Sequence, residues 1–347
     1  MAGTLSFRPN SYVHTSPYNG CWLQFYWDRI AENLCGRKVI TEADLRQVIE
    51  TAQALPELLI AGNFIVERAG VTSLCRELGI NIIHSEDGFF PHYETMHGDP
   101  VGFSWESSLS SLVFRRCSGR QKRLAQAARK SWLEFAVSEI PPVVRPPFVL
   151  WPLQIIADRV NRWDLNVSTW GELIAHFRMS LPEEIQLVVK EHPKNRDVDF
   201  VGLNEMLRDL PNTVMVARSV SLKSLLSRCA GAAGANSSVL YEARLMFRKP
   251  TYVYARSWYT NHGELFMPVE QSFAPRPLNR LDYLCDASLL CGDRLDDYSD
   301  WFLSQLLVRQ ITKQMATQNP AAFRSRVERL SYRAYAEYGE DIFEPAD

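Results

Sequence analysis

The chain has 347 residues, of which 46% are hydrophobic and 22% charged, and its formal charge is −2 at pH 7. This length predicts two domains, each large enough to bury a core. The near-neutral charge lacks the basic excess typical of nucleic-acid-binding proteins, so we expect no nucleic-acid partner. The seven cysteines are scattered without a CxxC pair. This spacing argues against a zinc site or a disulfide framework and is typical of a reducing compartment.

The first half of the chain alternates between helix-like and strand-like segments. Residues 65–78 have apolar positions at helical spacing and are followed by Gly79, a typical helix C-cap. Residues 80–84 form an apolar run typical of a buried strand, and a basic helix is predicted from about 118 to 137. The segment 141–147 contains four prolines, which no helix or central strand tolerates. We predict the inter-domain linker there.

The second half alternates strands with helices more regularly. The predicted strands are 148–154, 185–190, 213–217, 229–235 and 251–255. The predicted helices are 168–179, 221–228 and 237–247. This order is typical of βαβ units in a parallel sheet, which binds its ligands at the carboxyl ends of the strands.

The tail from about 277 is predicted to be mostly helical. Six apolar residues fit one face of it: Trp301, Leu303, Leu306, Leu307, Ile311 and Met315. We therefore predict an α/β fold with an N-terminal domain at 1–145, a second domain at 146–275 and a helical segment at 276–347.

A first group of polar residues, Glu86-Asp87-Gly88, follows the predicted strand at 80–84. A carboxyl group at a strand end can act as a general acid or base if burial or a neighbour raises its pKa. The alternative is a polar turn in which Gly88 adopts positive φ.

A second group follows the predicted strand at 185–190. Lys190, His192 and Lys194 suit a phosphate, because lysine supplies a point charge and histidine a hydrogen-bond donor. Pro193 would stiffen the turn that presents them. The alternative is a solvated basic turn.

A third group lies where a strand of small residues runs into a helix. Ser237 and Ser238 fall in the first helical turn, where free backbone N–H groups and hydroxyls make an anion site. Glu242 lies one turn beyond Ser238 on the same face and could hold ribose hydroxyls. The alternative is simple N-capping by Asn236 or Ser237.

Several familiar motifs are absent from the sequence: the P-loop, GxGxxG, HExxH and GxSxG. Asp197 and Asp199 form a DxD in a charged stretch that we interpret as a solvated loop. His92 and His97 flank a polar loop without a partner cysteine. We therefore predict no metal site.

Taken in order, these motifs resemble those of the capsule and lipopolysaccharide Kdo transferases. The resemblance runs from about 80 to 265. It is carried by Glu86-Asp87-Gly88-Phe89, Pro152-Leu153-Gln154 with Asp158, His192-Pro193, Asn236-Ser237-Ser238 with Glu242-Ala243, Lys249-Pro250 and Trp258-Tyr259. The sequence departs from the family pattern at Ile155-Ile156-Ala157, where acidic residues often stand, and after Tyr259.

The resemblance implies a GT-B-like fold of two Rossmann-like domains with parallel sheets facing a central cleft. It implies that Asp158 is the nucleophilic carboxylate and that Glu86, beside Asp87, is the acid/base for the acceptor hydroxyl. It also implies a donor site for the CMP-sugar made by Gln154, Lys190, His192, Pro193, Lys194, Asn236, Ser237, Ser238, Glu242 and Tyr259.

The function implied is transfer of Kdo from CMP-β-Kdo to a surface-polysaccharide or lipid-linked glycan, with retention. No cofactor is expected, because the CMP leaving group carries its own charge and needs no metal. One alternative keeps the fold and uses CMP-sialic acid. Another is a non-catalytic glycan-binding subunit of a polysaccharide assembly complex.

The acceptor is expected against a loop at 89–109. Five polar or aromatic residues of this loop are candidates for the acceptor wall: His92, Tyr93, His97, Trp105 and Glu106.

The protein is expected in the cytoplasm, because the sequence starts without a signal peptide and its apolar runs are short of the ~20 residues that span a bilayer. Peripheral contact with the inner membrane is a further hypothesis, with packing of the tail on the protein as the favoured alternative. The tail arginines invoked for it are Arg324, Arg326, Arg329 and Arg333.

Overall fold

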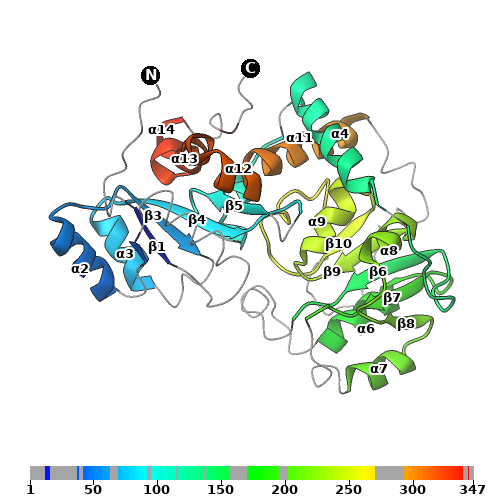
Figure 1. The fold of residues 1–347 in the computed structure, drawn as a ribbon. Helices are drawn as coiled ribbons and strands as arrows, with labels where there is room; N and C mark the ends of the chain where they lie inside the picture. Colours follow the sequence, from blue (N-terminus) through cyan, green and yellow to red (C-terminus); the bar gives the residue numbers. More distant parts are fainter. Residues whose placement is uncertain are drawn as a thin grey trace. The chain divides into compact units, whose positions relative to one another are not determined.

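The computed structural model describes twelve stretches of the chain. They are 12–15, 37–38, 42–62, 69–91, 95–102, 104–114, 116–135, 137–155, 170–194, 202–269, 293–338 and 343. The chain divides into two compact units, the first of Met1–Leu112 with Gln305–Asp347 and the second of Val113–Ser304. Each unit has a six-stranded sheet with helices, so the α/β prediction is confirmed (Figure 1).

The sheet of the first unit has the strand order β12-β5-β4-β3-β1-β2. Its strands are β1 (Tyr12–Thr15), β2 (Arg37–Lys38), β3 (Leu58–Gly62), β4 (Asn81–Asp87), β5 (Thr95–Asp99) and β12 (Gln310–Thr312). The first four are parallel, whereas β5 pairs antiparallel with β4 and β12 antiparallel with β5. The sheet is therefore mixed, with its antiparallel strands β5 and β12 at one edge.

Alternating apolar residues in β3 and β4 send side chains to both faces of this sheet. One face packs on α2 (Glu42–Ala52) and α3 (Ala69–Glu77), and the other on α13 (Pro320–Arg329). Two shorter helices, α12 (Lys313–Gln318) and α14 (Tyr332–Tyr338), flank α13 in the chain (Figure 1). Gly79 has φ +69°, as predicted for the residue that ends α3.

The predicted single apolar helix face at 301–315 is wrong. Helix α11 (Asp293–Val308) ends earlier, and Ile311 lies in β12 opposite Met96 of β5. A β-branched residue beside an open sheet edge gains ladder hydrogen bonds, and this tertiary pairing overrides the helical spacing.

Several apolar residues of the described part of the tail are buried. Ile311, Phe323, Val327 and Leu330 share one core with β3 and β4, and Arg326 donates to the carbonyl of Gln310 at 3.2 Å. These tail residues therefore pack on the protein within the first unit, as the favoured alternative predicts. Across the described stretches, no helix combines the length and apolarity needed to cross a bilayer.

The sheet of the second unit is wholly parallel, in the order β11-β10-β9-β6-β7-β8. Its strands are β6 (Phe148–Pro152), β7 (Gln186–Lys190), β8 (Thr213–Val216), β9 (Gly231–Gly234), β10 (Thr251–Val253) and β11 (Met267–Pro268). Its helices are α4 (Gly119–Leu133), α6 (Trp170–Ser180), α7 (Leu203–Asp209), α8 (Leu222–Arg228), α9 (Ser238–Leu245) and most of α11. The strands and helices predicted for this half are confirmed.

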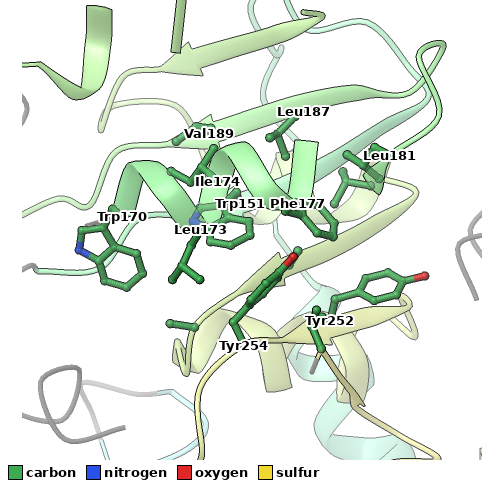
Figure 2. Packing of buried hydrophobic residues seen from close by; sticks show 14 of the residues in the cluster. Trp151, Trp170, Leu173, Ile174, Phe177, Leu181, Leu187, Val189, Tyr252 and Tyr254 are labelled. Carbon is green, nitrogen blue, oxygen red and sulfur yellow. The ribbon is translucent and has the colours of Figure 1, made fainter. Parts of the chain in front are cut away.

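Helix α6 covers one face of this sheet. Its Phe177 packs against Trp151 of β6, and Trp170, Ile174 and Tyr254 belong to the same cluster (Figure 2). Trp151 and Phe177 are fully buried, with ring centroids 5.5 Å apart. Burying large aromatic side chains against β-branched strand residues supplies the main apolar stabilisation of this unit.

The division between the units falls at 112/113, ahead of the proline-rich segment. Helix α4 belongs with the second unit because its buried Arg129 donates to the carbonyl of Leu245 at 2.6 Å and to Ser299 Oγ at 3.0 Å. Arg129 also forms an ion pair with Asp300. These contacts tie α4 to α9 and α11, so the prolines lie inside the second unit.

Candidate functional site

The carboxyl edge of the second sheet contains a topological switch point. From β6 the chain moves to β7 and β8 on one side and then returns to β9 on the other side of β6. In open parallel sheets, ligands bind outside the carboxyl ends of the strands at such a point. The residues that follow β6 and β9 are therefore placed to contact a ligand.

Gln154 follows β6, Asn236 follows β9, and the two side chains join across this point. Gln154 Nε2 donates to Asn236 Oδ1 at 2.8 Å, and the backbone N–H of Asn236 donates to Gln154 Oε1 at 3.2 Å. Both residues are partly exposed. The structure thus brings together two predicted donor-site residues that are 82 positions apart.

Helix α9 begins directly beyond Asn236. Ser237 is its N-cap, and the Ser237 hydroxyl accepts from the backbone N–H of Val239 at 3.3 Å. The capping alternative is therefore confirmed for Ser237. Ser238 opens the helix and is partly exposed. The N-terminal end of α9, with its positive dipole, faces the same sheet edge as the Gln154–Asn236 bridge.

Tyr259 reaches this edge indirectly. Its ring is only 1% exposed and packs among Tyr241, Trp258 and Phe266. Its hydroxyl donates to the carbonyl of Ser237 at 3.2 Å. The ring is therefore held in the core and supports the residue that caps α9, and the donor contact of Tyr259 stays a prediction.

Glu242 lies on the side of α9 that faces α4 and α8. Its Oε1 accepts from the indole N–H of Trp132 at 3.0 Å, and Lys223 Nζ lies 3.9 Å from the centre of the Trp132 ring. Burial raises the pKa of Glu242 to about 7, opposed by the hydrogen bond from Trp132 and the charge of Lys223. The ribose role of Glu242 stays a prediction, and the structure adds Trp132 as the residue that orients it.

His192 lies in the turn after β7 and is partly exposed. The backbone N–H of Lys194 donates to His192 Nδ1 at 3.1 Å. An accepting Nδ1 places the proton of the neutral ring on Nε2, which is then the ring's donor. Pro193 and Lys194 are exposed in the same turn.

Lys190 ends β7 and is only 5% exposed. Its Nζ donates at 3.0 Å to the carbonyls of both Glu191 and Arg218. Burial lowers the pKa of Lys190 to about 8. Two of its three donors therefore join the ends of β7 and β8, and this contact explains its burial without a phosphate.

Glu86 and Asp87 are the last residues of β4 in the first unit, and both are partly exposed. The expectation of a turn with positive φ at Gly88 is wrong, since Gly88 has no positive φ. Glycine is required for a different reason. A Cβ on Gly88 would lie 1.9 Å from Thr95 Oγ1 and 2.6 Å from the Thr95 carbonyl carbon.

The expected loop at 89–109 is partly wrong as well. Residues 95–99 form β5, so His97 is a buried strand residue and lies across the ladder from Glu86. The polar segment after β5 is organised by Asp99, whose carboxylate accepts from the backbone N–H of Gly102 and from the hydroxyls of Ser107 and Ser108. Sequence reasoning missed Asp99, because its partners are revealed only by the fold of this segment.

Some predicted residues lie outside the described stretches. They are Asp158, Asp197, Asp199, His92 and Tyr93. Among the described residues, no group of three or more His, Cys, Asp or Glu side chains could hold a metal ion. The described cysteines Cys75, Cys117 and Cys229 are free and buried.

The part of the chain that contains these donor-site candidates matches a known protein family. Residues 119–265 match the family "Capsule polysaccharide biosynthesis protein", and they include the Gln154–Asn236 bridge and the turn at His192. The predicted resemblance to capsule-biosynthesis proteins is thereby confirmed for these residues. No curated protein sequence matches the chain significantly.

Two solved structures from Thermosulfurimonas dismutans share the fold. The KpsC beta Kdo 2,7 transferase is 15% identical, with a TM-score of 0.55 over 92% of this chain and 98% of that chain. The KpsC beta Kdo 2,4 transferase is 16% identical, with a TM-score of 0.52 over 84% of this chain and 90% of that chain. The GT-B-like fold predicted from the sequence is therefore confirmed, except that the sheet of the first unit is mixed and not wholly parallel.

Proposed function

We propose that this protein is a glycosyltransferase that moves Kdo from CMP-β-Kdo to a glycan acceptor, with retention of configuration. The observation that carries the proposal is the Gln154–Asn236 bridge at the switch point, beside the N-terminus of α9. Amide groups and a helix N-terminus at one sheet edge suit a nucleoside monophosphate. The match of residues 119–265 to a capsule-biosynthesis family supports the choice of a sugar donor.

In the first step, a carboxylate oxygen of Asp158 forms a bond to the anomeric carbon. The bond from that carbon to the phosphate oxygen breaks, and its electron pair leaves with CMP. His192 and the α9 N-terminus stabilise the charge that builds on the phosphate. The product of this step is a covalent glycosyl–enzyme intermediate.

In the second step, the acceptor hydroxyl oxygen attacks the anomeric carbon and passes its proton to the Glu86 carboxylate. The bond to Asp158 breaks and regenerates that carboxylate. Two successive inversions give overall retention, as in retaining glycosidases. Because CMP leaves with its own charge, we propose that the reaction needs no metal, and transfer in excess EDTA should equal transfer in its absence.

The first test is thermal stabilisation of the full chain by CMP, UMP, AMP and GMP. We expect stabilisation by CMP alone, and its loss in His192→Ala. His176→Ala is the matched control, because His176 lies on α6 and its Nδ1 contacts the hydroxyl of Tyr254 in the core region. Preferential stabilisation by UMP or a purine nucleotide would contradict the CMP-sugar assignment.

The second test is turnover with CMP-Kdo and with CMP-sialic acid as donors. Transfer or slow hydrolysis of CMP-Kdo alone is the expected result. A preference for CMP-sialic acid would overturn the Kdo assignment. Glycan binding without turnover of either donor would favour a non-catalytic subunit of a polysaccharide assembly complex.

A further inference from the structure

Two acid–histidine pairs lie on one face of the β4–β5 hairpin. In the antiparallel register Glu86 is opposite His97, and His84 is opposite Asp99. Directly opposed residues of an antiparallel pair point to the same face, so these four side chains share it. The sequence separates the members of each pair by eleven and fifteen positions, and only the hairpin brings them together.

The pair nearer the strand end is the partly exposed one. His97 Nε2 lies 3.9 Å from Glu86 Oε2, an ion-pair distance that the partly exposed Glu86 side chain, at 19% exposure, must shorten to form a hydrogen bond. His97 Nδ1 lies 2.8 Å from the carbonyl oxygen of Asp87. Because a carbonyl only accepts, Nδ1 must carry a proton, and in the neutral ring Nε2 then presents its lone pair to Glu86.

The ring of His97 is held in this orientation from several sides. Phe89 stacks on it, with ring centroids 4.2 Å apart and planes inclined by 29°. The turn that carries Phe89 is closed by the N–H of Gly88, which donates to the carbonyl of Thr95 at 2.7 Å. Gln310 Oε1 from β12 accepts from the N–H groups of Phe89 and Phe90 at 2.6 and 2.5 Å.

The second pair is of a different kind. His84 is 4% exposed, and burial lowers its pKa to about 4, while the charge of Asp99 opposes this shift. The Asp99 carboxylate is 1% exposed and accepts several hydrogen bonds from residues 101–108. That carboxylate is therefore committed to the fold of the segment that follows β5, and this pair is structural.

We propose that His97 is a positioning residue for Glu86: it orients the carboxylate and shares the proton that Glu86 takes. Before the transfer the ring is neutral and Glu86 is a carboxylate, and after it the pair holds either carboxylic acid with imidazole or carboxylate with imidazolium. When Glu86 takes the acceptor's proton, Nε2 is the atom placed to stabilise the protonated carboxyl by accepting its hydrogen bond. The catalytic part of this inference rests on the proposed function, in which Glu86 is the base.

The two nitrogens of His97 can be replaced separately. In His97→Asn the amide nitrogen takes the place of Nδ1 and keeps the bond to the Asp87 carbonyl, whereas Nε2 is lost. In His97→Gln the terminal amide takes the place of Nε2 opposite Glu86, where its oxygen can accept from the protonated carboxyl, and the bond to Asp87 is lost. His176→Gln on α6 is the control for a histidine outside this pair.

We expect His97→Asn to keep the KM for donor but to lose kcat by about 10- to 100-fold. Both variants lose the ring that stacks on Phe89, so the melting temperature should fall by a similar amount in each. His97→Gln should nevertheless recover part of the loss of kcat, because it restores a polar group opposite Glu86. Wild-type kcat in both variants, or equal losses of kcat in the two, would overturn the positioning role.

A second measurement is independent of the donor and of the reaction. NMR titration of the histidine ring signals, with His97 assigned by its loss in His97→Asn, gives the pKa of His97 in the wild type and in Glu86→Gln. An adjacent carboxylate favours the protonated ring, so we expect Glu86→Gln to lower this pKa. An unchanged pKa would refute the pairing and leave the glycosyltransferase proposal intact. Inactivity with CMP-Kdo would contradict the glycosyltransferase proposal and leave the pairing intact.

Discussion

The two units build their candidate strand ends in different ways. In the second unit, every strand is parallel, and the residues at the edge follow β6, β7 and β9 directly in the chain. In the first unit, the end of β4 is covered by the returning strand β5 and closed by Gln310 of β12, 220 residues or more away in sequence. A parallel edge presents its own loop residues, whereas a hairpin edge presents residues fixed by partners from other parts of the chain. The second arrangement suits a group whose orientation must be held, such as a general base.

The largest expected effect is on kcat, and it comes from the end of β4 in the first unit. Glu86→Gln should lower kcat by about 10³-fold and leave CMP binding unchanged, because a general base acts on the acceptor and contributes little to donor affinity. Asp158→Asn should have an effect of the same order. Steady-state kinetics with CMP-Kdo and calorimetry with CMP would measure both.

The control for this prediction is Glu77→Gln, since Glu77 is an exposed residue at the end of α3. Near-normal turnover in Glu86→Gln would show that the base lies elsewhere.

The two units should also respond to pH with opposite sign. Burial raises the pKa of Glu242 to about 7, so between pH 4.5 and 7 the folded second unit keeps a proton that the unfolded chain loses, and its stability falls as pH rises. Burial lowers the pKa of His84 to about 4, so the unfolded chain takes up a proton that the folded first unit excludes, and stability is lost as pH falls from 6.5 to 4. Each effect is on the order of 3 kcal/mol at full extent.

Hydrogen exchange of peptides from each unit, corrected for intrinsic rates and compared at pH 5 and pH 7.5, would measure these two slopes. Glu242→Gln should remove the slope of the second unit alone, because glutamine keeps an acceptor for Trp132 but does not titrate. Parallel slopes in the two units would contradict the contrast.

The hydrogen bonds to Gln310 that close the end of β4 in the first unit can be removed without changing the donor-site residues of the second unit. Gln310→Ala leaves the N–H groups of Phe89 and Phe90 without their acceptor, which should destabilise the first unit by about 2 kcal/mol. Thermal or chemical unfolding would measure the loss, and CMP affinity should not change. Gln310→Glu, which keeps an acceptor oxygen, should lose less, and an equal loss in both variants would argue against the hydrogen bonds as the cause.

The smallest effect is expected on CMP affinity, from the Gln154–Asn236 bridge at the sheet edge of the second unit. Gln154→Ala and Asn236→Ala should each weaken CMP binding by about five-fold, corresponding to about 1 kcal/mol. The double variant should be no weaker than the weaker single, because both substitutions break the same pair of hydrogen bonds. Additive losses in calorimetry would show that the two side chains act on the ligand separately.

The local sequence was sufficient for most of the second unit. Alternating strands and helices identified β6, β7, β8, β9 and β10, and the rule that ligands bind at carboxyl ends identified the positions of His192 and Asn236. Gln154 was identified only by the resemblance to the capsule transferases. These features are local in the chain, because a parallel βαβ unit places each loop at the same edge. The partners of Lys190 and Tyr259 were not predicted, since burial and the carbonyls they bind depend on neighbouring strands and helices.

By itself, the sequence determined the α/β class, the parallel direction of the strands in the second unit, the polar groups that end these strands, and the resemblance to the capsule transferases. Hydrophobic period and turn chemistry act within a few residues, so a single chain displays them directly. Only the tertiary structure decided that Ile311 extends a sheet, that Gly88 is needed for the close approach of Thr95, and that His97 lies opposite Glu86. Each of these results depends on strand pairing between distant or reversing segments, whose register is set by the packing of the whole unit.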